Sequence, residues 1–269
     1  MKIDHLVVNV DADVQSDTNR IQSIRDSGLP YEPKWGKGTR GFKVSNIWIG
    51  SEYLEMVRIK RPDGGGWVAD WTKLYLEGHR GVVGFALDVP DLDAVYERLS
   101  SKGIEISRPE PLAFRWFFNL LTRTMPWRNA YVKPFEGVPF QFFFQQMNDD
   151  KSRAFMEQYM VPNSQEAGIT GMAAVDIYGK WSSRDMEVVK TIFEECCQIE
   201  QEGILEIELS GKSGQWIRFV PAHDYRIEIS LITENNQYEN MRVSLPDLTL
   251  NIQSRSKKEI VNPLLKEKA

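Results

Sequence analysis

The chain has 269 residues, of which 42% are hydrophobic and 26% charged, as in globular proteins and unlike disordered chains. Its 33 basic and 38 acidic residues give a net charge of −5, so no basic field exists to hold nucleic acid. No apolar run is as long as a membrane helix, which needs about 20 residues, and the first residues lack the apolar core of a signal peptide. We therefore expect a soluble protein without a membrane partner, and the charge leads us to expect no nucleic-acid partner.

The first part of the chain reads as a strand, a helix and further strands. Residues 3–10 are β-rich, and residues 14–26 have loosely helical apolar spacing that ends at Gly28. Residues 43–49 and 53–59 alternate in polarity and are separated by a turn at Gly50 and Ser51. This order predicts a compact unit over residues 1–60.

The second part repeats this order. Residues 82–89 predict a strand, and residues 91–99 carry apolar side chains at helical spacing. Asp91 is placed to cap this helix, and Gly103 is placed to end it. Strands are expected at 130–133 and 138–145, which completes a second unit over residues 80–147.

A third unit is expected over residues 168–253. A strand at 169–178 precedes a helix capped by Ser182 or Ser183, and strands are expected at 204–209, 215–220 and 225–232. Residues 60–77 and 148–167 read as linkers or covering loops, and residues 254–269 as a Lys-rich tail.

The two cysteines, Cys196 and Cys197, are adjacent. They form neither a disulfide framework nor a zinc motif, and we expect structural thiols late in the helix of the third unit. A reducing compartment, the cytoplasm, fits this pattern best.

The openings of the three units are IDHLVVNV, VVGFALDV and ITGMAAVDI, and the segments NIWIGSEYLEMV and GFALDVPDLDAVYERLSSKGIE follow the same plan. This pattern resembles the βαβββ module of the vicinal oxygen chelate (glyoxalase/bleomycin resistance/dioxygenase) superfamily, and in particular its glyoxalase-like domains. The resemblance implies an α+β fold. In it, the modules 1–60 and 80–147 form one cup-shaped mixed sheet with helices on its convex side, followed by a third module-like unit.

The resemblance also implies a divalent metal, held by a His on the first strand and a Glu on the last strand of each module. His5 and Glu55 match these positions in the first module. Gly84 and Gly171 stand where the other modules would have His, and Gln141 or Phe143 stands where the second Glu would be, while Glu228 matches in the third module. The cofactor is therefore either a metal such as Zn, Fe, Mn, Co or Ni, completed by His79, His223 or the substrate, or none.

His5 and Glu55 can also act without a metal. A carboxylate beside an imidazole in an apolar cup can serve as a general base, so both are candidate catalytic residues.

The segment 114–128 mixes large aromatic side chains with arginines. As a pocket wall it suits an aromatic ligand that carries a carboxylate, and it suits a core or an oligomer interface equally well. Trp48 can line the same cup. The candidate substrate-binding residues are Trp48, Arg115, Trp116, Phe118 and Trp127.

These observations leave three functions open. The first is a metal-assisted lyase, isomerase or dioxygenase that acts on a small oxygenated or aromatic ligand. The second is a metal-free protein that binds or sequesters a small molecule, and the third is a scaffold whose own side chains fill the cup. The odd third module can be completed in a homodimer or pack alone on the first pair.

Overall fold

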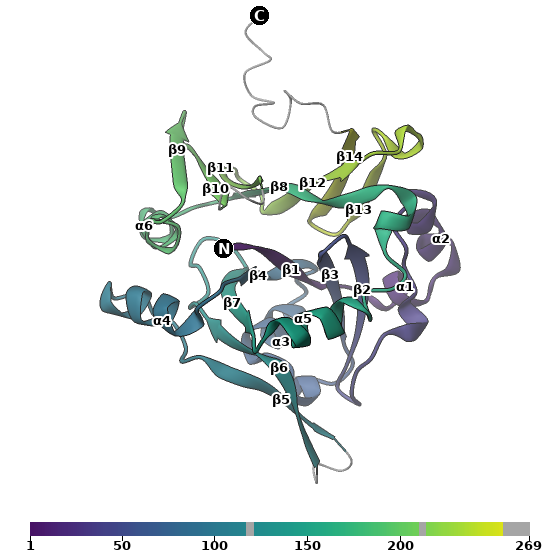
Figure 1. Cartoon of the computed structure of the whole chain (residues 1–269), viewed down its shortest axis with the longest axis horizontal. Helices are drawn as coiled ribbons and strands as arrows, with labels where there is room; N and C mark the ends of the chain where they lie inside the picture. The colour runs from purple at the N-terminus through teal and green to yellow at the C-terminus, as the bar shows by residue number, and fades with distance from the viewer. Residues whose placement is uncertain (117–120, 210–213, 255–269) are drawn as a thin grey trace, which may run out of the picture.

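In a computed structural model of the chain, residues 1–116, 121–209 and 214–254 are described, and residues 114–116 and 121–123 are described by their backbone alone. These residues form two seven-stranded sheets that lie face to face (Figure 1).

The first sheet contains both expected N-terminal modules. Its strand order is β2-β3-β1-β4-β7-β6-β5. β1 is parallel to β3, β4 is parallel to β7, and β1 and β4 pair antiparallel at the centre, so two modules meet along their first strands. This confirms the predicted mixed sheet. The strands are β1 (Lys2–Asn9), β2 (Phe42–Ile49), β3 (Glu52–Ile59), β4 (Gly81–Asp88), β5 (Glu110–Trp116), β6 (Leu121–Tyr131) and β7 (Gln141–Met147).

The second sheet repeats this arrangement in the order β13-β14-β12-β8-β11-β10-β9. β12, which the sequence analysis takes as the last strand of a third module, pairs antiparallel with β8 and parallel with β14, as β4 does with β1 and β7. The sheet is thus completed within the chain and needs no dimer partner. The strands are β8 (Ile169–Gly179), β9 (Cys197–Gln201), β10 (Ile204–Leu209), β11 (Gln215–Pro221), β12 (Arg226–Thr233), β13 (Arg242–Leu245) and β14 (Leu248–Ser254).

The helices begin where the sequence provides caps. Asp91 accepts a hydrogen bond from the Ala94 amide, and Ser182 forms a capping box with Asp185, as expected. Gly103 follows the helix that Asp91 caps and has a left-handed φ of 78°. The α-helices are α1 (Ala12–Ser16), α2 (Thr18–Asp26), α3 (Ala69–Leu76), α4 (Leu92–Ser101), α5 (Asp150–Glu157) and α6 (Ser183–Ile192). The 3-10 turns are η1 (Pro33–Trp35), η2 (Gly64–Gly66), η3 (Ser164–Ala167) and η4 (Asn236–Tyr238).

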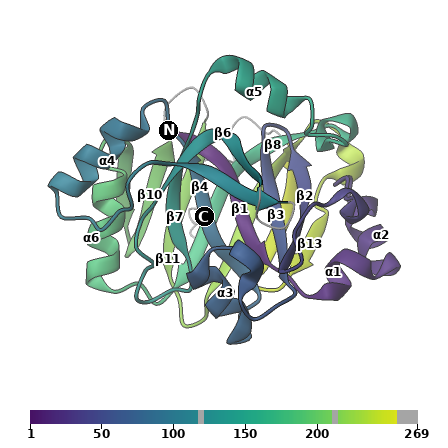
Figure 2. The same ribbon diagram turned by 90° about the horizontal axis from the view of Figure 1, so that it is seen from below.

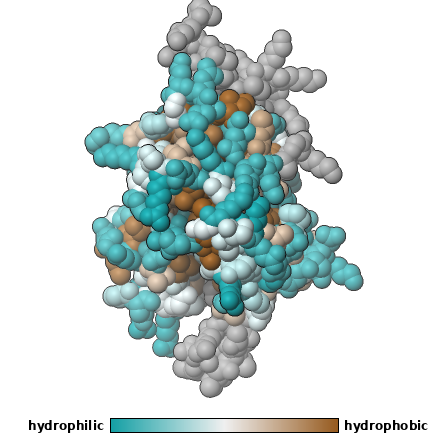
Figure 3. Space-filling model, turned by 90° about the vertical axis from the view of Figure 1, so that its left-hand side faces the viewer, coloured by the Kyte–Doolittle hydropathy of each residue, from teal (hydrophilic) through white to brown (hydrophobic). Residues whose placement is uncertain are grey.

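The main core lies between the sheets. The inner faces contribute alternating apolar residues, and Phe142 of the first sheet meets Phe219 of the second with ring centroids 6.1 Å apart. α4 and α6 close one side of this core and α1 and α2 lie at the other (Figures 1 and 2). On the side of α4 and α6 apolar surface shows only in patches among hydrophilic side chains (Figure 3). Because the inner faces of the two sheets pack on each other, their outer faces point away from each other.

Two sequence expectations are wrong in detail. The linker 60–77 contains α3, whose Trp71 is 2% exposed and packs on the outer face of the first sheet. The cysteines do not lie in a helix, because α6 ends at Ile192, and Cys196 is half-buried whereas Cys197 opens β9 and is exposed. None of the helices in residues 1–116, 121–209 and 214–254 is long and apolar enough to cross a membrane.

Candidate functional site

The outer face of the first sheet carries the candidate site, which we call the cup. Side chains alternate along a strand, so His5 on β1, Glu55 on β3 and Phe143 on β7 share this face with Val7 and Val57. α3 packs against it from outside. The cup is lined by His5, Tyr53, Glu55, Trp71, Tyr131 and Phe143.

A β-bulge adds Asp4 to the cup. The register of β1 against β4 shifts between Ile3 and His5, so Asp4 and His5 do not point to opposite faces. Asp4 Oδ2 lies 2.6 Å from His5 Nδ1 and also accepts a hydrogen bond of 3.1 Å from Gln145 Nε2. Both Asp4 and His5 are buried. Asp4 therefore fixes the imidazole through Nδ1 and leaves Nε2 for other contacts.

Aromatic rings hold His5 from two sides. Its ring stacks on Tyr53 with centroids 4.3 Å apart and meets the edge of Phe143 at 5.3 Å. Phe143 in turn stacks on Tyr131 at 5.1 Å and contacts Trp71 at 5.6 Å. The polar groups of the cup therefore lie among aromatic surfaces.

Glu55 has no hydrogen-bond or ion-pair partner among the residues that the structure describes. Burial raises the pKa of its carboxyl, His5 lowers this pKa and Asp4 raises it further. The side chain is half-buried, so the carboxylate lies deep but remains reachable. An ionisable group with a shifted pKa in such a place is a functional-site candidate.

The donor set does not fit the divalent metal that the resemblance implies. β1 and β4 pair antiparallel, with His5 opposite Ala86 and Val7 opposite Gly84. A local two-fold axis between these two pairs therefore relates the two modules. This axis makes Gly84 the counterpart of His5. By the same relation, Phe143 is the counterpart of Glu55.

The counterpart positions offer no metal donor. A Cβ at Gly84 would lie 2.5 Å from the Trp71 ring, so Trp71 fills the space that a second histidine would need. Across the described part of the chain, no three His, Cys, Asp or Glu side chains converge closely enough to hold a metal ion.

The proposed third ligands lie elsewhere. His79 faces Asp247 at 3.9 Å and the Tyr225 ring, and His223 is exposed and pairs with Asp224. Neither contacts the cup.

The matches in the C-terminal unit need correction too. A Cβ at Gly171 would point at Glu52 Oε2, so Gly171 faces the first sheet and not the outer face. Glu228 lies on β12, which occupies the place of a first strand and not of a last one.

The structure brings only some of the predicted substrate-binding residues to the cup. Trp48 contacts Tyr53 with ring centroids 4.6 Å apart, and Trp127 shares its face of β6 with Tyr131. Residues 115 and 116 lie in β5 at the sheet edge, but the side chains of Arg115, Trp116 and Phe118 lie outside the described residues.

Sequence reasoning missed three residues of the cup. Asp4 has the wrong parity for a regular strand, and only the bulge brings it beside His5. Trp71 lies in the supposed linker, where Trp67, Trp71 and Tyr75 at helical spacing signal an amphipathic helix. Tyr131 lies in a predicted strand, but its face depends on pairing with β7.

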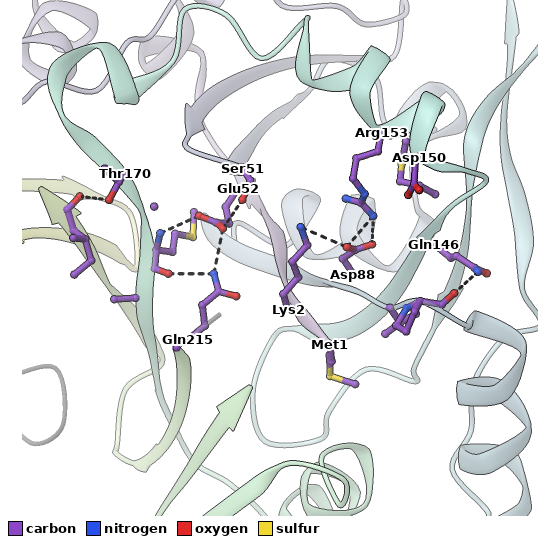
Figure 4. A pocket seen from close by; sticks show the side chains of 18 of the residues that line it. Met1, Lys2, Ser51, Glu52, Asp88, Gln146, Asp150, Arg153, Thr170 and Gln215 are labelled. Atoms are coloured by element: carbon purple, nitrogen blue, oxygen red, sulfur yellow. Dashed lines mark hydrogen bonds and ion pairs between the residues drawn. The ribbon is translucent and has the colours of Figure 1, made fainter. Parts of the chain in front are cut away.

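A cavity of about 970 Å³ lies elsewhere, at the junction of the two sheets. Figure 4 shows that Lys2 and Arg153 converge there on Asp88, and that Glu52 faces Gln215. Glu52 also accepts a hydrogen bond from the Met172 amide. Because Glu52 is buried and paired with Gln215 and Met172 of the second sheet, its contacts tie the two sheets together.

Comparisons with known proteins agree with this architecture. A family model described as a glyoxalase-like domain matches residues 3–186. A crystal structure of a hypothetical protein from Staphylococcus aureus is similar with a TM-score of 0.70 and 14% identity, over 94% of this chain and 98% of that chain. A methylmalonyl-CoA epimerase from Streptomyces coelicolor is similar with a TM-score of 0.39 and 16% identity, over 55% of this chain and 99% of that chain. The sequence has no match among curated proteins. The chain belongs to the glyoxalase-like domain family.

Proposed function

We propose that the cup binds a small molecule without a divalent metal and that Glu55 is its polar anchor. The observation that carries this proposal is the Glu55 carboxylate, which lies among aromatic side chains and has no partner among the described residues. A carboxylate in such surroundings destabilises the fold unless something compensates its charge. A bound ligand supplies that compensation.

The aromatic lining supports a largely apolar ligand body. Tyr53 and Tyr131 are half-buried beside the polar groups, and the buried rings of Phe143 and Trp71 pack on Tyr131. Apolar walls with a few polar groups are typical of small-molecule sites. Trp71 lies against Gly84, at the place of the second histidine, whereas the Glu55 side chain is half-buried and still reachable. This favours the binding function over a scaffold with a filled cup.

Proton transfer is a second candidate function, and the contact of 2.6 Å between Asp4 and His5 favours it. Asp4 orients the imidazole, so its Nε2 can exchange a proton with a ligand while Glu55 acts as the base. Burial, which raises the pKa of Glu55, makes this carboxylate a stronger base than an exposed one.

The proposal is tested by thermal shift on protein treated with EDTA and dialysed, using phenol, indole, cyclohexanol and choline as probes. We expect at least one probe to raise the melting temperature, and we expect Glu55→Gln to remove its effect. Glu228→Gln, on the outer face of the other sheet, is the matched control and should behave like wild type. Binding that appears only after Zn²⁺ or Mn²⁺ is added contradicts the metal-free site, and no shift with any probe contradicts the binding function.

The cytoplasm remains the proposed location, because Cys196 and Cys197 are free thiols and Cys197 is exposed. Exposed thiols persist in reducing compartments.

A further inference from the structure

The aromatic side chains of the cup surround a negative charge. His5 and Phe143 are in contact, Phe143 stacks on Tyr131, and Trp71 meets both Phe143 and Tyr131 with centroids 5.6 and 6.0 Å away. The Glu55 carboxylate acts electrostatically on both Tyr53 and Tyr131, so it lies near these rings. Ring faces carry negative partial charge, and together with a carboxylate they form the surroundings that organic cations prefer.

Among the described residues, His5 alone acts on this charge as a cation would, by lowering the pKa of Glu55. Neither Lys nor Arg forms an ion pair with Glu55 there. Arg128, the described arginine of the aromatic segment, points to α4, where it contacts both carboxylate oxygens of Asp93 and the Gln146 side chain. Within the part of that segment whose side chains are described, the Arg128 guanidinium is therefore paired away from the cup and does not face an anionic ligand there.

The remaining polar groups of this face include acceptors and donors, and the buried indole N–H groups of Trp67 and Trp71 have no partner. Asn46 lies directly opposite Glu55 across β2 and β3, and its Oδ1 is buried without a partner. The buried side-chain oxygens of Asn9, Asn129 and Gln141, on β1, β6 and β7, have no partner either. Unpaired buried acceptors call for a hydrogen-bond donor or a positive charge.

We infer that the ligand of the cup is a small organic cation, an ammonium whose charge lies on Glu55 and whose carbon substituents lie against the half-buried rings of Tyr53 and Tyr131. This inference rests on the proposed function and names its ligand class. Two features of the face support it: a carboxylate without a hydrogen-bond or ion-pair partner among the described residues, and aromatic rings beside it.

The experiment compares two probes of the same shape, choline and its uncharged carbon isostere 3,3-dimethylbutan-1-ol. Binding to the full chain is measured by tryptophan fluorescence, since Trp71 and Trp67 lie at the cup, and by calorimetry. We expect choline to bind at least about tenfold more tightly than the isostere. Glu55→Gln should remove this preference, whereas Glu228→Gln should keep it.

The outcomes separate the inference from the proposed function. Equal binding of the two probes, or tighter binding of the isostere, overturns the cation inference and leaves the binding function intact. So does binding of phenol or indole alone. If no probe binds, both fail. The comparison of probes on the wild-type chain decides the matter even if the Glu55 variant does not fold.

Discussion

The outer faces of the two sheets have the same strand arrangement, but they differ in whether a carboxylate on the face has an ion-pair partner among the described residues. When β1 and β8 are aligned on their bulges, Val7 and Asp176 occupy equivalent positions. Val7 pairs with Glu55 on β3, and Asp176 pairs with Arg218 on β11, so Glu55 and Arg218 are equivalent too. In the second sheet Asp176 pairs with Arg218 at 3.2 Å. In the first sheet Glu55 has no such partner among the described residues.

This difference shows which face has charge left for a ligand. Arg218 lowers the pKa of Asp176, although burial, Glu228 and Glu206 still raise it to about 6. The second face therefore neutralises its buried carboxylate from within the chain, at least in part. For the first face, we propose that a ligand in the cup supplies this compensation.

The largest expected effect comes from breaking the pair in the second sheet. Arg218→Leu should destabilise the fold by about 3–5 kcal/mol, because it leaves Asp176 without its cation. Urea unfolding at pH 7.5 measures this. The double variant Asp176→Asn with Arg218→Leu should regain most of the loss. A loss below about 1 kcal/mol for the single variant would show that the pairing does not matter.

The variant Gly84→Ala tests whether Trp71 fills the space beside Gly84. The new Cβ would lie 2.5 Å from the Trp71 ring, so we expect a loss of about 1–3 kcal/mol in the free energy of unfolding. Trp71→Leu provides room, and Gly84→Ala should cost less in that background than in the wild type. Equal costs in both backgrounds would contradict the contact as the cause.

Glu55→Gln should stabilise the chain by about 1 kcal/mol or more at neutral pH, because the variant removes an uncompensated charge. The folded-state pKa of Glu55 lies above its unfolded value, so the folded state binds a proton more readily. The destabilisation by the charged form is therefore absent at acidic pH and grows as pH rises through the unfolded and then the folded pKa. Melting temperatures of wild type and variant at pH 4 and pH 7.5 measure this, and a gap that widens at the lower pH would contradict it.

Choline binding should weaken on acidification at a pH above the ordinary glutamate range. Protonation of Glu55 removes the charge that attracts the ammonium, and burial moves that protonation upward in pH. Calorimetry between pH 4 and pH 8 gives the profile. Binding that does not change over this range would exclude Glu55 as the anchor.

The sequence predicts much of this molecule from local patterns. The alternation in β1 and β3 and the family resemblance put His5 and Glu55 on one face, and Asp91 and Ser182 mark helix starts that the structure confirms. The mixed sheet of two modules is likewise confirmed. These features depend on side-chain periods and caps, which are encoded within a few residues.

The rest depends on contacts between distant segments. A one-residue bulge brings Asp4 beside His5, and no period announces it. Trp71 reaches Gly84 only because α3 folds back onto the sheet. β12 pairs antiparallel with β8. It is followed by the 3-10 turn η4 and the short strand β13, and not by an α-helix whose periodicity would predict another module. Such placements are decided by tertiary packing.

The most direct test of the account is an NMR titration of the side-chain carboxyl carbons, with Glu55 and Asp176 assigned through their amide variants. We expect Glu55 to titrate above the ordinary glutamate value and choline to lower its pKa, because a bound cation favours the charged form. Asp176 should titrate near 6 and not respond to choline. A Glu55 carboxyl that titrates at its ordinary value and does not respond to choline would contradict the claim that the cup holds an uncompensated charge for a cationic ligand.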